Sequence, residues 1–161
     1  GREAFGRRRG DRTAAGMKRE TLAAEDAEDL QIISAKLQDA VARVGDLVWL
    51  PKARRFAALF NRFKWENKRK TDNLRVRSGL YFNGVLSAKS HKIMRGDADA
   101  VLSLLAITFT SKGAEDPGGM VELIFAGGGT IKLDVEAIDA GLSDVSGEWA
   151  ALGRPEHETD S

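Results

Sequence analysis

The sequence predicts an α+β fold: a curved, mostly antiparallel sheet or barrel of about seven strands, with an N-terminal helix and a C-terminal helix. Three observations predict it. Apolar residues recur at helical spacing near both ends, alternating segments fill the middle, and turn signals separate those segments. The strand count and the closing helix suggest a pleckstrin-homology-like barrel, by analogy of fold alone.

The N-terminal helix is predicted to begin at Asp26. This residue can cap the helix, and Asp29 falls near the positive end of the helix dipole. Apolar residues then recur about every 3.6 positions, which predicts one buried stripe: Leu30, Ile33, Leu37 and Val41.

After this helix the period changes to that of strands. Residues 46–50 and 55–65 flank Pro51-Lys52-Ala53-Arg54 and predict a hairpin with a four-residue connection. The apolar residues of 55–63 also fit a helical stripe, so a basic amphipathic helix stays open there. Such a helix would favour a membrane-surface or partner-helix role over a sheet edge.

Later segments complete the predicted sheet. Residues 75–86 and 101–110 read as strands, and both faces of the second are mostly apolar, which predicts a central strand buried on two sides. Residues 120–126 and 130–135 form a hairpin through Gly127-Gly128-Gly129. A phosphate-binding loop is the other reading of these glycines, but the Lys-Ser/Thr ending of a nucleotide loop is missing.

The C-terminal helix is predicted from one more apolar stripe. Ile138, Leu142, Val145 and Trp149 follow one another at spacings of four, three and four residues. Trp149 is expected to close the core.

A chain of 161 residues predicts a single domain, placed at 17–152. Residues 1–16 are Arg-rich with little apolar content, and they read as a flexible basic arm or an upstream extension before Met17. The alternative interpretation of residues 1–16 is a basic arm that contacts phosphate through Arg7, Arg8 and Arg9. Residues 153–161 form a polar tail.

Composition narrows the class of protein. Apolar residues at 42% and charged residues at 30% are ordinary for a globular domain, and no apolar run is long enough for a membrane helix. There is no cysteine and no apolar segment typical of a signal peptide. We therefore expect a cytoplasmic protein.

Charge is sorted along the chain. Residues 51–79 carry ten Lys and Arg against two acidic residues, whereas residues 114–161 carry eleven Asp and Glu against two basic ones. The basic segment also contains aromatic residues, a combination that can bind phosphates and stack on bases or headgroups. The predicted anion- or partner-binding residues are Arg62, Lys64, Trp65, Lys68, Arg69 and Lys70. The alternative is a solvated loop that follows a charged sheet edge.

No set of residues specifies a reaction. His157 lies in the polar tail, and Ser90 and His91 are neighbours on a strand, so their side chains should point to opposite faces. A metal site is not expected from Asp134, Glu136, Asp139 and Asp144, because their spacing matches no calcium loop and a helix dipole explains the later ones. We expect no cofactor.

Several segments resemble one known family over about residues 20–155. They include Gly45-Asp46-Leu47, Leu50-Pro51-Lys52, Asn61-Arg62-Phe63 with Trp65-Glu66, Val101 to Ile107, and Phe125-Ala126-Gly127-Gly128-Gly129 before Leu133-Asp134-Val135-Glu136. On these segments the chain resembles the alphaproteobacterial domain-of-unknown-function 2948 family (DUF2948). The resemblance implies a small cytoplasmic protein and supplies no activity or catalytic residue.

The functional expectation is a non-enzymatic binding or adaptor module that acts through a protein partner or self-association. A weak binder of nucleic acid or anionic lipid, acting through residues 51–79, is the first alternative. The second is an enzyme whose site assembles only at a dimer interface.

Overall fold

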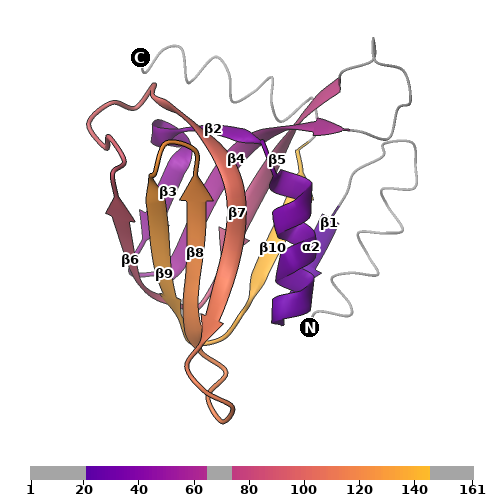
Figure 1. The fold of residues 1–161 in the computed structure, drawn as a ribbon, viewed down its shortest axis with the longest axis vertical. Helices are drawn as coiled ribbons and strands as arrows, with labels where there is room; N and C mark the ends of the chain where they lie inside the picture. Colours follow the sequence, from indigo (N-terminus) through magenta and orange to yellow (C-terminus); the bar gives the residue numbers. More distant parts are fainter. Residues whose placement is uncertain (1–20, 65–73, 146–161) are drawn as a thin grey trace.

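In the computed structural model, residues 21–64 and 74–145 are described, and their strands form one ten-stranded sheet around a shared core (Figure 1). Every strand pair among them is antiparallel. The elements in chain order are β1 (Thr21–Ala24), α2 (Ala27–Leu37), β2 (Val41–Arg43), the 3-10 helix η1 (Val44–Asp46), β3 (Leu47–Leu50), β4 (Arg55–Lys64), β5 (Leu74–Phe82), β6 (Val85–His91), β7 (Val101–Ser111), β8 (Gly119–Phe125), β9 (Thr130–Val135) and β10 (Ala140–Asp144).

The sheet has two halves that curve toward each other. Its strand order is β1-β10-β5-β4-β2-β7-β8-β9-β6, and β3 pairs with β4 beside β2. The short strand β2 joins the halves, since Val41 faces Asn61 of β4 on one side and Ser103 of β7 on the other. In Figure 1 the half made of β7, β8 and β9 lies in front of β3 and β4. Two seams therefore remain where the halves share no strand pairing, one beside β7 and one between β3 and β6.

Helix α2 covers the seam beside β7. Asp26 caps it as predicted, accepting a hydrogen bond from the backbone N–H of Asp29 at 2.8 Å. Ser34 Oγ accepts from the backbone N–H of Ile107, and Gln31 Nε2 donates to the Ile107 carbonyl, so the helix satisfies strand groups that β2 is too short to reach. The predicted stripe is correct to Leu37. Val41 was wrongly included, because the helix ends at Leu37 and Val41 begins β2.

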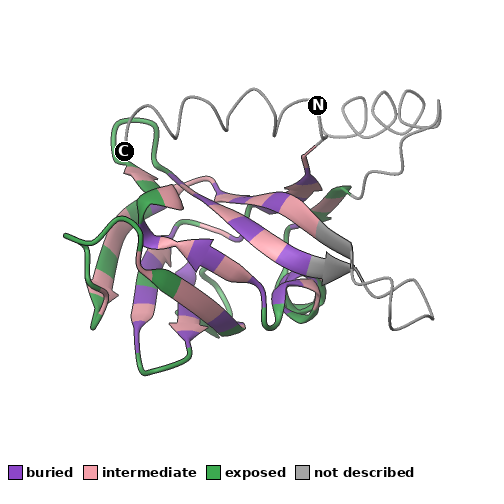
Figure 2. Ribbon diagram, turned by 90° about the horizontal axis from the view of Figure 1, so that it is seen from above, coloured by how far each residue is buried: buried purple, intermediate pink, exposed green. Residues whose placement is uncertain are grey.

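The β3–β4 hairpin is confirmed, and residues 55–63 form a strand. Trp49 pairs with Phe56 and Leu50 with Arg55 across the four-residue connection. Burial alternates along β4, where Phe56, Ala58 and Phe60 face the core, as the colour bands of Figure 2 show along the strands. The open alternative of an amphipathic helix over 55–63 was wrong.

The middle strands differ from the prediction in two places. The strand predicted over 75–86 ends at Phe82, and a separate strand, β6, begins at Val85. The β8–β9 hairpin turns at Gly127 and Gly128, whose φ angles of 91° and 99° suit glycine. Strand β7 was predicted to be buried on both faces. Instead Leu104 and Ile107 are fully buried, while Val101 and Leu105 are 62% and 45% exposed. Strand β7 therefore has one core face and one outer face.

The fold class was predicted wrongly at its C-terminal end. Ile138 precedes a strand, not a helix, because Ala140–Asp144 form β10 between β1 and β5. Leu142 packs opposite Leu80, and Asp144 reaches a buried Arg62. A strand with apolar neighbours on both sides can mimic a helical stripe, which is why spacing alone misled.

The corrected architecture is a mostly antiparallel ten-stranded sheet with one α-helix in the described residues. The prediction of a barrel of about seven strands with an N-terminal and a C-terminal helix was wrong. The pleckstrin-homology analogy rested on that strand count and that closing helix, so it loses both premises. Trp149, the arm at 1–16, the tail at 153–161 and the domain limits at 17 and 152 lie outside the described residues.

The core lies between the two halves of the sheet. Its largest fully buried side chains come from both halves and from α2, and they include Phe60, Phe82, Phe125, Leu30, Leu104 and Leu133. Burial of this apolar surface is the main term that holds the halves together.

Substitution of Gly141 tests the strand assignment by the sign of its effect. A Cβ on Gly141 would lie 2.4 Å from the Tyr81 ring, which covers this glycine from β5. We expect Gly141→Ala to lower the free energy of unfolding by about 1–3 kcal/mol through overpacking. In a helix the same change would instead stabilise by about 1 kcal/mol. Urea unfolding measures the change in the free energy of unfolding, and a gain in stability would contradict the assignment of Ala140–Asp144 as a strand.

Candidate functional site

A pocket of about 320 Å³ opens at the seam between β3 and β6. The described strands β3 and β6 share no register, so the two halves of the sheet part here. Sheet residues from both halves line the pocket, namely Leu47, Trp49 and Phe56 from one half and Ala88, Ser90 and Ile131 from the other. The pocket therefore depends on the curvature of the whole sheet.

Strand alternation builds the wall of the pocket at β3. Leu47 and Trp49 point to the core side and pack against the buried cluster, whereas Val48 and Leu50 are 41% and 43% exposed on the outside. Trp49 stands directly opposite Phe56, which is 3% exposed. Two aromatic side chains on neighbouring strands thus form an apolar floor.

The opposite wall comes from β6 and the segment that follows it. Ala88 and Ser90 face Leu133 and Ile131 of β9. Beyond β6, residues 92–100 run past η1 and are held by two backbone hydrogen bonds of 2.9 Å, from Val44 N–H to the Ala100 carbonyl and from Gly45 N–H to the Ala98 carbonyl. This segment contributes Ile93 and Arg95 to the pocket.

The β8–β9 turn fixes the start of that segment. A Cβ on Gly129 would meet the Lys92 carbonyl oxygen at 3.1 Å and Ile93 Cγ1 at 3.3 Å. Gly129 therefore lets the turn pack directly against the backbone beside the pocket. The glycines serve as a hairpin turn, as predicted, and one of them also supports a wall of the pocket.

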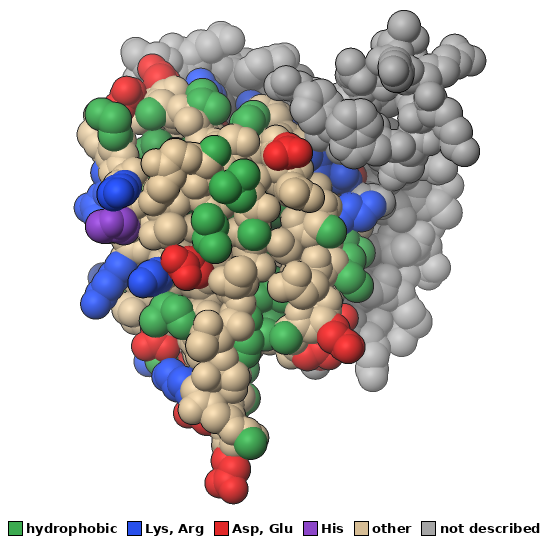
Figure 3. Space-filling model, viewed as in Figure 1, with side chains coloured by type: hydrophobic (Ala, Val, Ile, Leu, Met, Phe, Trp, Pro, Cys, Tyr) green, Lys and Arg blue, Asp and Glu red, His purple; other side chains and the backbone are tan. Residues whose placement is uncertain are grey.

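Three polar side chains line the pocket: Lys89, Ser90 and Arg95. Arg95 Nη1 donates to Ser90 Oγ at 3.5 Å. Lys89 is exposed, as are His91 and Lys92, which follow it at the end of β6. Figure 3 shows Lys, Arg and His side chains gathered along this edge of the molecule.

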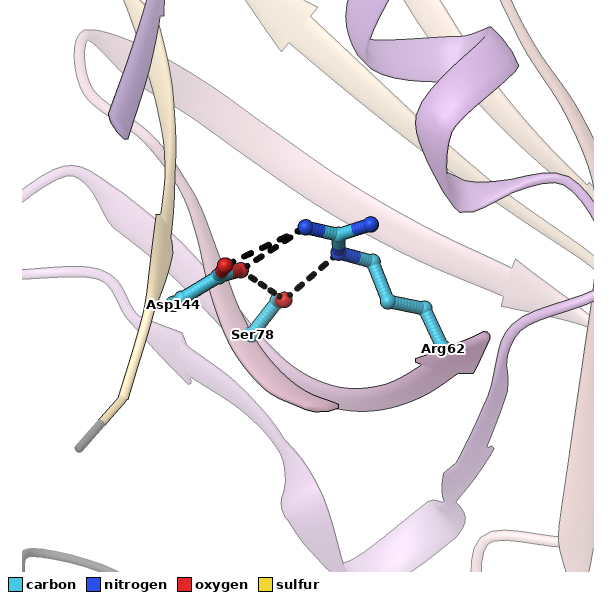
Figure 4. Close-up of polar contacts among 3 residues, drawn as sticks. All are labelled: Arg62, Ser78 and Asp144. Atoms are coloured by element: carbon cyan, nitrogen blue, oxygen red, sulfur yellow. Dashed lines mark hydrogen bonds and ion pairs between the residues drawn. The ribbon is translucent and has the colours of Figure 1, made fainter. Parts of the chain in front are cut away.

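A second polar cluster lies inside the sheet and joins β4, β5 and β10 (Figure 4). Arg62 Nη2 contacts both carboxylate oxygens of Asp144 at 3.1 and 3.2 Å, and Arg62 Nε donates to Ser78 Oγ at 3.0 Å. Ser78 in turn donates to Asp144 at 2.7 Å. Arg62 and Asp144 are each 3% exposed and Ser78 is fully buried, so the cluster serves packing and offers no access to a substrate.

One residue of this cluster, Arg62, was predicted to lie on a binding surface, and the structure buries it. Arg62 was expected at an anion- or partner-binding surface, but the structure places its guanidinium inside, against Asp144. Lys64 ends β4, and its side chain lies outside the described part. Trp65, Lys68, Arg69 and Lys70 also lie outside it, so the structure does not bring the six predicted residues together.

The acidic residues near the C-terminus are spread among different partners. Asp134 meets Lys112 at 3.3 Å, Glu136 pairs with Arg54 across the sheet, and Asp144 pairs with Arg62. Within residues 21–64 and 74–145, no three His, Asp or Glu side chains come close enough to hold a metal ion. Ser90 contacts Arg95, not its neighbour His91.

The pocket was missed at the level of sequence. Its residues are spread over positions 44 to 131 and belong to six segments. One signal was available: β3 reads Leu-Val-Trp-Leu, an uncharged strand, and an exposed edge strand usually carries a charge or a proline against pairing. That pattern indicates that the edge of β3 is not simply exposed to solvent, but it does not show that β6 forms the opposite wall of a pocket.

Comparison with known proteins assigns a family and no activity. A family model described as "Protein of unknown function (DUF2948)" matches residues 21–157. No curated protein and no solved structure matches the chain. Among the described residues, no helix has the length and apolar character needed to cross a membrane.

Proposed function

This chain belongs to the DUF2948 family, and we propose that it works as a non-enzymatic binding module whose ligand enters the pocket between β3 and β6. One observation carries the proposal. In the part of the chain that the structure describes, α2 covers the seam beside β7, whereas the seam between β3 and β6 holds a pocket of about 320 Å³.

The pocket has the features of a small-molecule site. Such sites occupy about 300–1,000 Å³ and combine apolar walls with a few placed polar groups. Here the pocket of about 320 Å³ has an aromatic floor at Trp49 and Phe56 and polar groups at Lys89, Ser90 and Arg95. The backbone hydrogen bonds at Val44 and Gly45 hold the segment after β6 against η1, which reduces the loop ordering that ligand binding requires.

A neutral fluorescent probe tests this function. N-phenylnaphthylamine brightens in apolar surroundings, and we expect the wild-type protein to bind it at one saturable site. Ala88→Phe fills the pocket from β6 and should weaken binding by about tenfold or more, a loss of about 1.4 kcal/mol. Fluorescence titration measures both affinities.

The matched control places the same side chain elsewhere. Ala35 is exposed on α2, so Ala35→Phe should leave the affinity unchanged. Circular dichroism and thermal midpoints confirm that both variants fold, and the smaller Ala88→Leu serves if Ala88→Phe does not. The proposal fails if wild type shows no saturable binding, or if blocking at Ala88 has no larger effect than the control.

A protein partner or self-association is the second candidate, and the edge of β3 favours it. In the described residues β3 pairs only with β4, and Val48 and Leu50 are exposed beside its open edge. Such an edge can accept a strand from another chain. Light scattering of the purified protein, with Val48→Lys as the variant that disfavours pairing, separates this candidate from a monomeric ligand binder.

The remaining alternatives stay predictions. Binding of nucleic acid or anionic lipid through residues 51–79 is left without Arg62, which is buried, and Lys68, Arg69 and Lys70 lie outside the described part. An enzyme assembled at a dimer interface is likewise untested. We also propose a cytoplasmic location, which a chain with zero cysteines suits because it forms no disulfide.

A further inference from the structure

We propose that the pocket between β3 and β6 selects a small amphipathic anion, a molecule with one carboxylate, sulfonate or similar head and a compact apolar body. This inference rests on the proposed function and names the class of ligand. It follows from the charges at the pocket, from the absence of ion pairs to them within residues 21–64 and 74–145, and from the apolar floor.

Both charged residues that line the pocket are cations. Lys89 comes from β6 and Arg95 from the segment after it, and Ser90 between them adds a hydroxyl that Arg95 contacts at 3.5 Å. His91 and Lys92 continue the same stretch of chain. An anion at this side of the pocket therefore meets positive charge and hydrogen-bond donors together.

These cations keep their charge available for a ligand. The ion pairs of the described residues engage Arg43, Arg54, Arg62 and Lys112, and none engages Lys89 or Arg95.

Three acidic groups in η1 and in the segment after β6 have other partners. Asp46 and Asp99 approach Arg43 at 3.6 and 3.9 Å, and Asp97 Oδ1 accepts from the backbone N–H of Asp99. These contacts use the carboxylates within η1 and the turn at 97–99. Asp46 and Asp99 therefore pair with Arg43, and neither pairs with Lys89 or Arg95.

The floor of the pocket requires an apolar body on the ligand. Leu47, Trp49, Phe56 and Ile131 supply it, with two aromatic rings paired across β3 and β4. A volume of about 320 Å³ is near the lower end for ligand pockets, so one short acyl chain or a fused aromatic ring fits, and a two-chain phospholipid does not. An inorganic anion would leave the apolar floor unused.

Two probes that share one apolar body isolate the charge. Anilinonaphthalenesulfonate is N-phenylnaphthylamine with an added sulfonate. At low salt we expect wild-type protein to bind the sulfonate about tenfold more tightly than the neutral probe. The double variant Lys89→Glu with Arg95→Glu should lose that preference, so that it binds the sulfonate no more tightly than the neutral probe. High salt should shrink the preference in the wild type, because ions screen exposed charges.

Controls separate charge at the pocket from net charge. Lys52→Glu reverses an exposed lysine in the β3–β4 turn and should leave both affinities unchanged. If the double reversal unfolds the protein, Lys89→Gln with Arg95→Gln removes the charge more gently. Octanoate and octanol, as competitors of the neutral probe, extend the test to acyl ligands, and octanoate should compete more strongly only in the wild type.

Each result of the two-probe experiment supports or contradicts the proposed anion preference. Equal binding of the two probes by wild type, or an equal change of both affinities on charge reversal, would overturn the anion preference and leave the pocket as a neutral site. If wild type binds neither probe, the proposed function itself fails, and this inference fails with it. Loss of the preference in Lys52→Glu would show that net charge, not the pocket, attracts the sulfonate.

Discussion

Asp144→Ala is expected to lower the free energy of unfolding by about 3–5 kcal/mol, because it removes a carboxylate that contacts the buried Arg62 guanidinium. Both side chains are 3% exposed, and Ser78 loses its acceptor in the same step. Contacts with Asp144 and Ser78 offset the desolvation of the arginine, so removing one of these partners costs more than the pair gains on forming.

Urea unfolding measures this loss, and the chain offers a matched control. Arg54 and Glu136 form an ion pair with a shorter distance, 2.5 Å against 3.1 Å, but their side chains are 59% and 50% exposed. Glu136→Ala should therefore cost no more than about 1 kcal/mol. The combined change Arg62→Met with Asp144→Leu should recover much of the stability, since apolar replacements remove both buried charges. A loss below about 1 kcal/mol in Asp144→Ala would show that water reaches the pair.

Phe82→Ala is expected to cost about 3–5 kcal/mol, the usual loss for a fully buried phenylalanine. Phe82 is 0% exposed and stands on β5 between two neighbours, with Phe56 of β4 on one side and Ala140 of β10 on the other. Its truncation would leave a cavity where three strands meet.

The same urea experiment checks this prediction, with Leu86→Ala as control. Leu86 follows in the next strand but is 44% exposed, and its truncation should cost no more than about 0.5 kcal/mol. If Phe82→Ala and Leu86→Ala lose similar amounts, the strands around Phe82 collapse into the cavity or the core is packed less tightly than described.

The elements that the sequence predicted correctly depend on interactions between residues close together in the chain. Asp26 caps α2 because its carboxylate accepts from a backbone N–H three residues on, an interaction set within one turn. The β3–β4 and β8–β9 hairpins follow from short connections between alternating segments. These interactions need no distant partner, and the sequence alone predicted them.

Spacing failed where a distant partner chooses between structures. Ile138, Leu142 and Val145 fit a helix, yet Ala140–Asp144 pair with β1 and β5, where Leu142 is buried and Gly141 lies under Tyr81. Gly141 inside the stripe was a local signal against a helix, since glycine costs about 1 kcal/mol there. The sequence of residues 138–145 alone did not show that β1 and β5 would be its pairing partners.

The candidate site divides in the same way. Charge counting found the basic residues 51–79, but it could not tell that strand alternation turns Arg62 inward to meet Asp144, 82 residues later. The pocket escaped prediction because its two walls are far apart in the chain: Trp49 and Ile131 line the same pocket only once the two halves of the sheet curve together.

The sequence by itself determined the family, the start of α2, the two hairpins and the turn at Gly127 and Gly128. Only the tertiary structure decided the strand at Ala140–Asp144, the inward position of Arg62 and the pocket between β3 and β6. The physical reason is the range of the interactions. Caps and turns depend on groups a few residues apart, whereas strand pairing, burial of a charge and an open seam depend on which distant residues the folded sheet brings together.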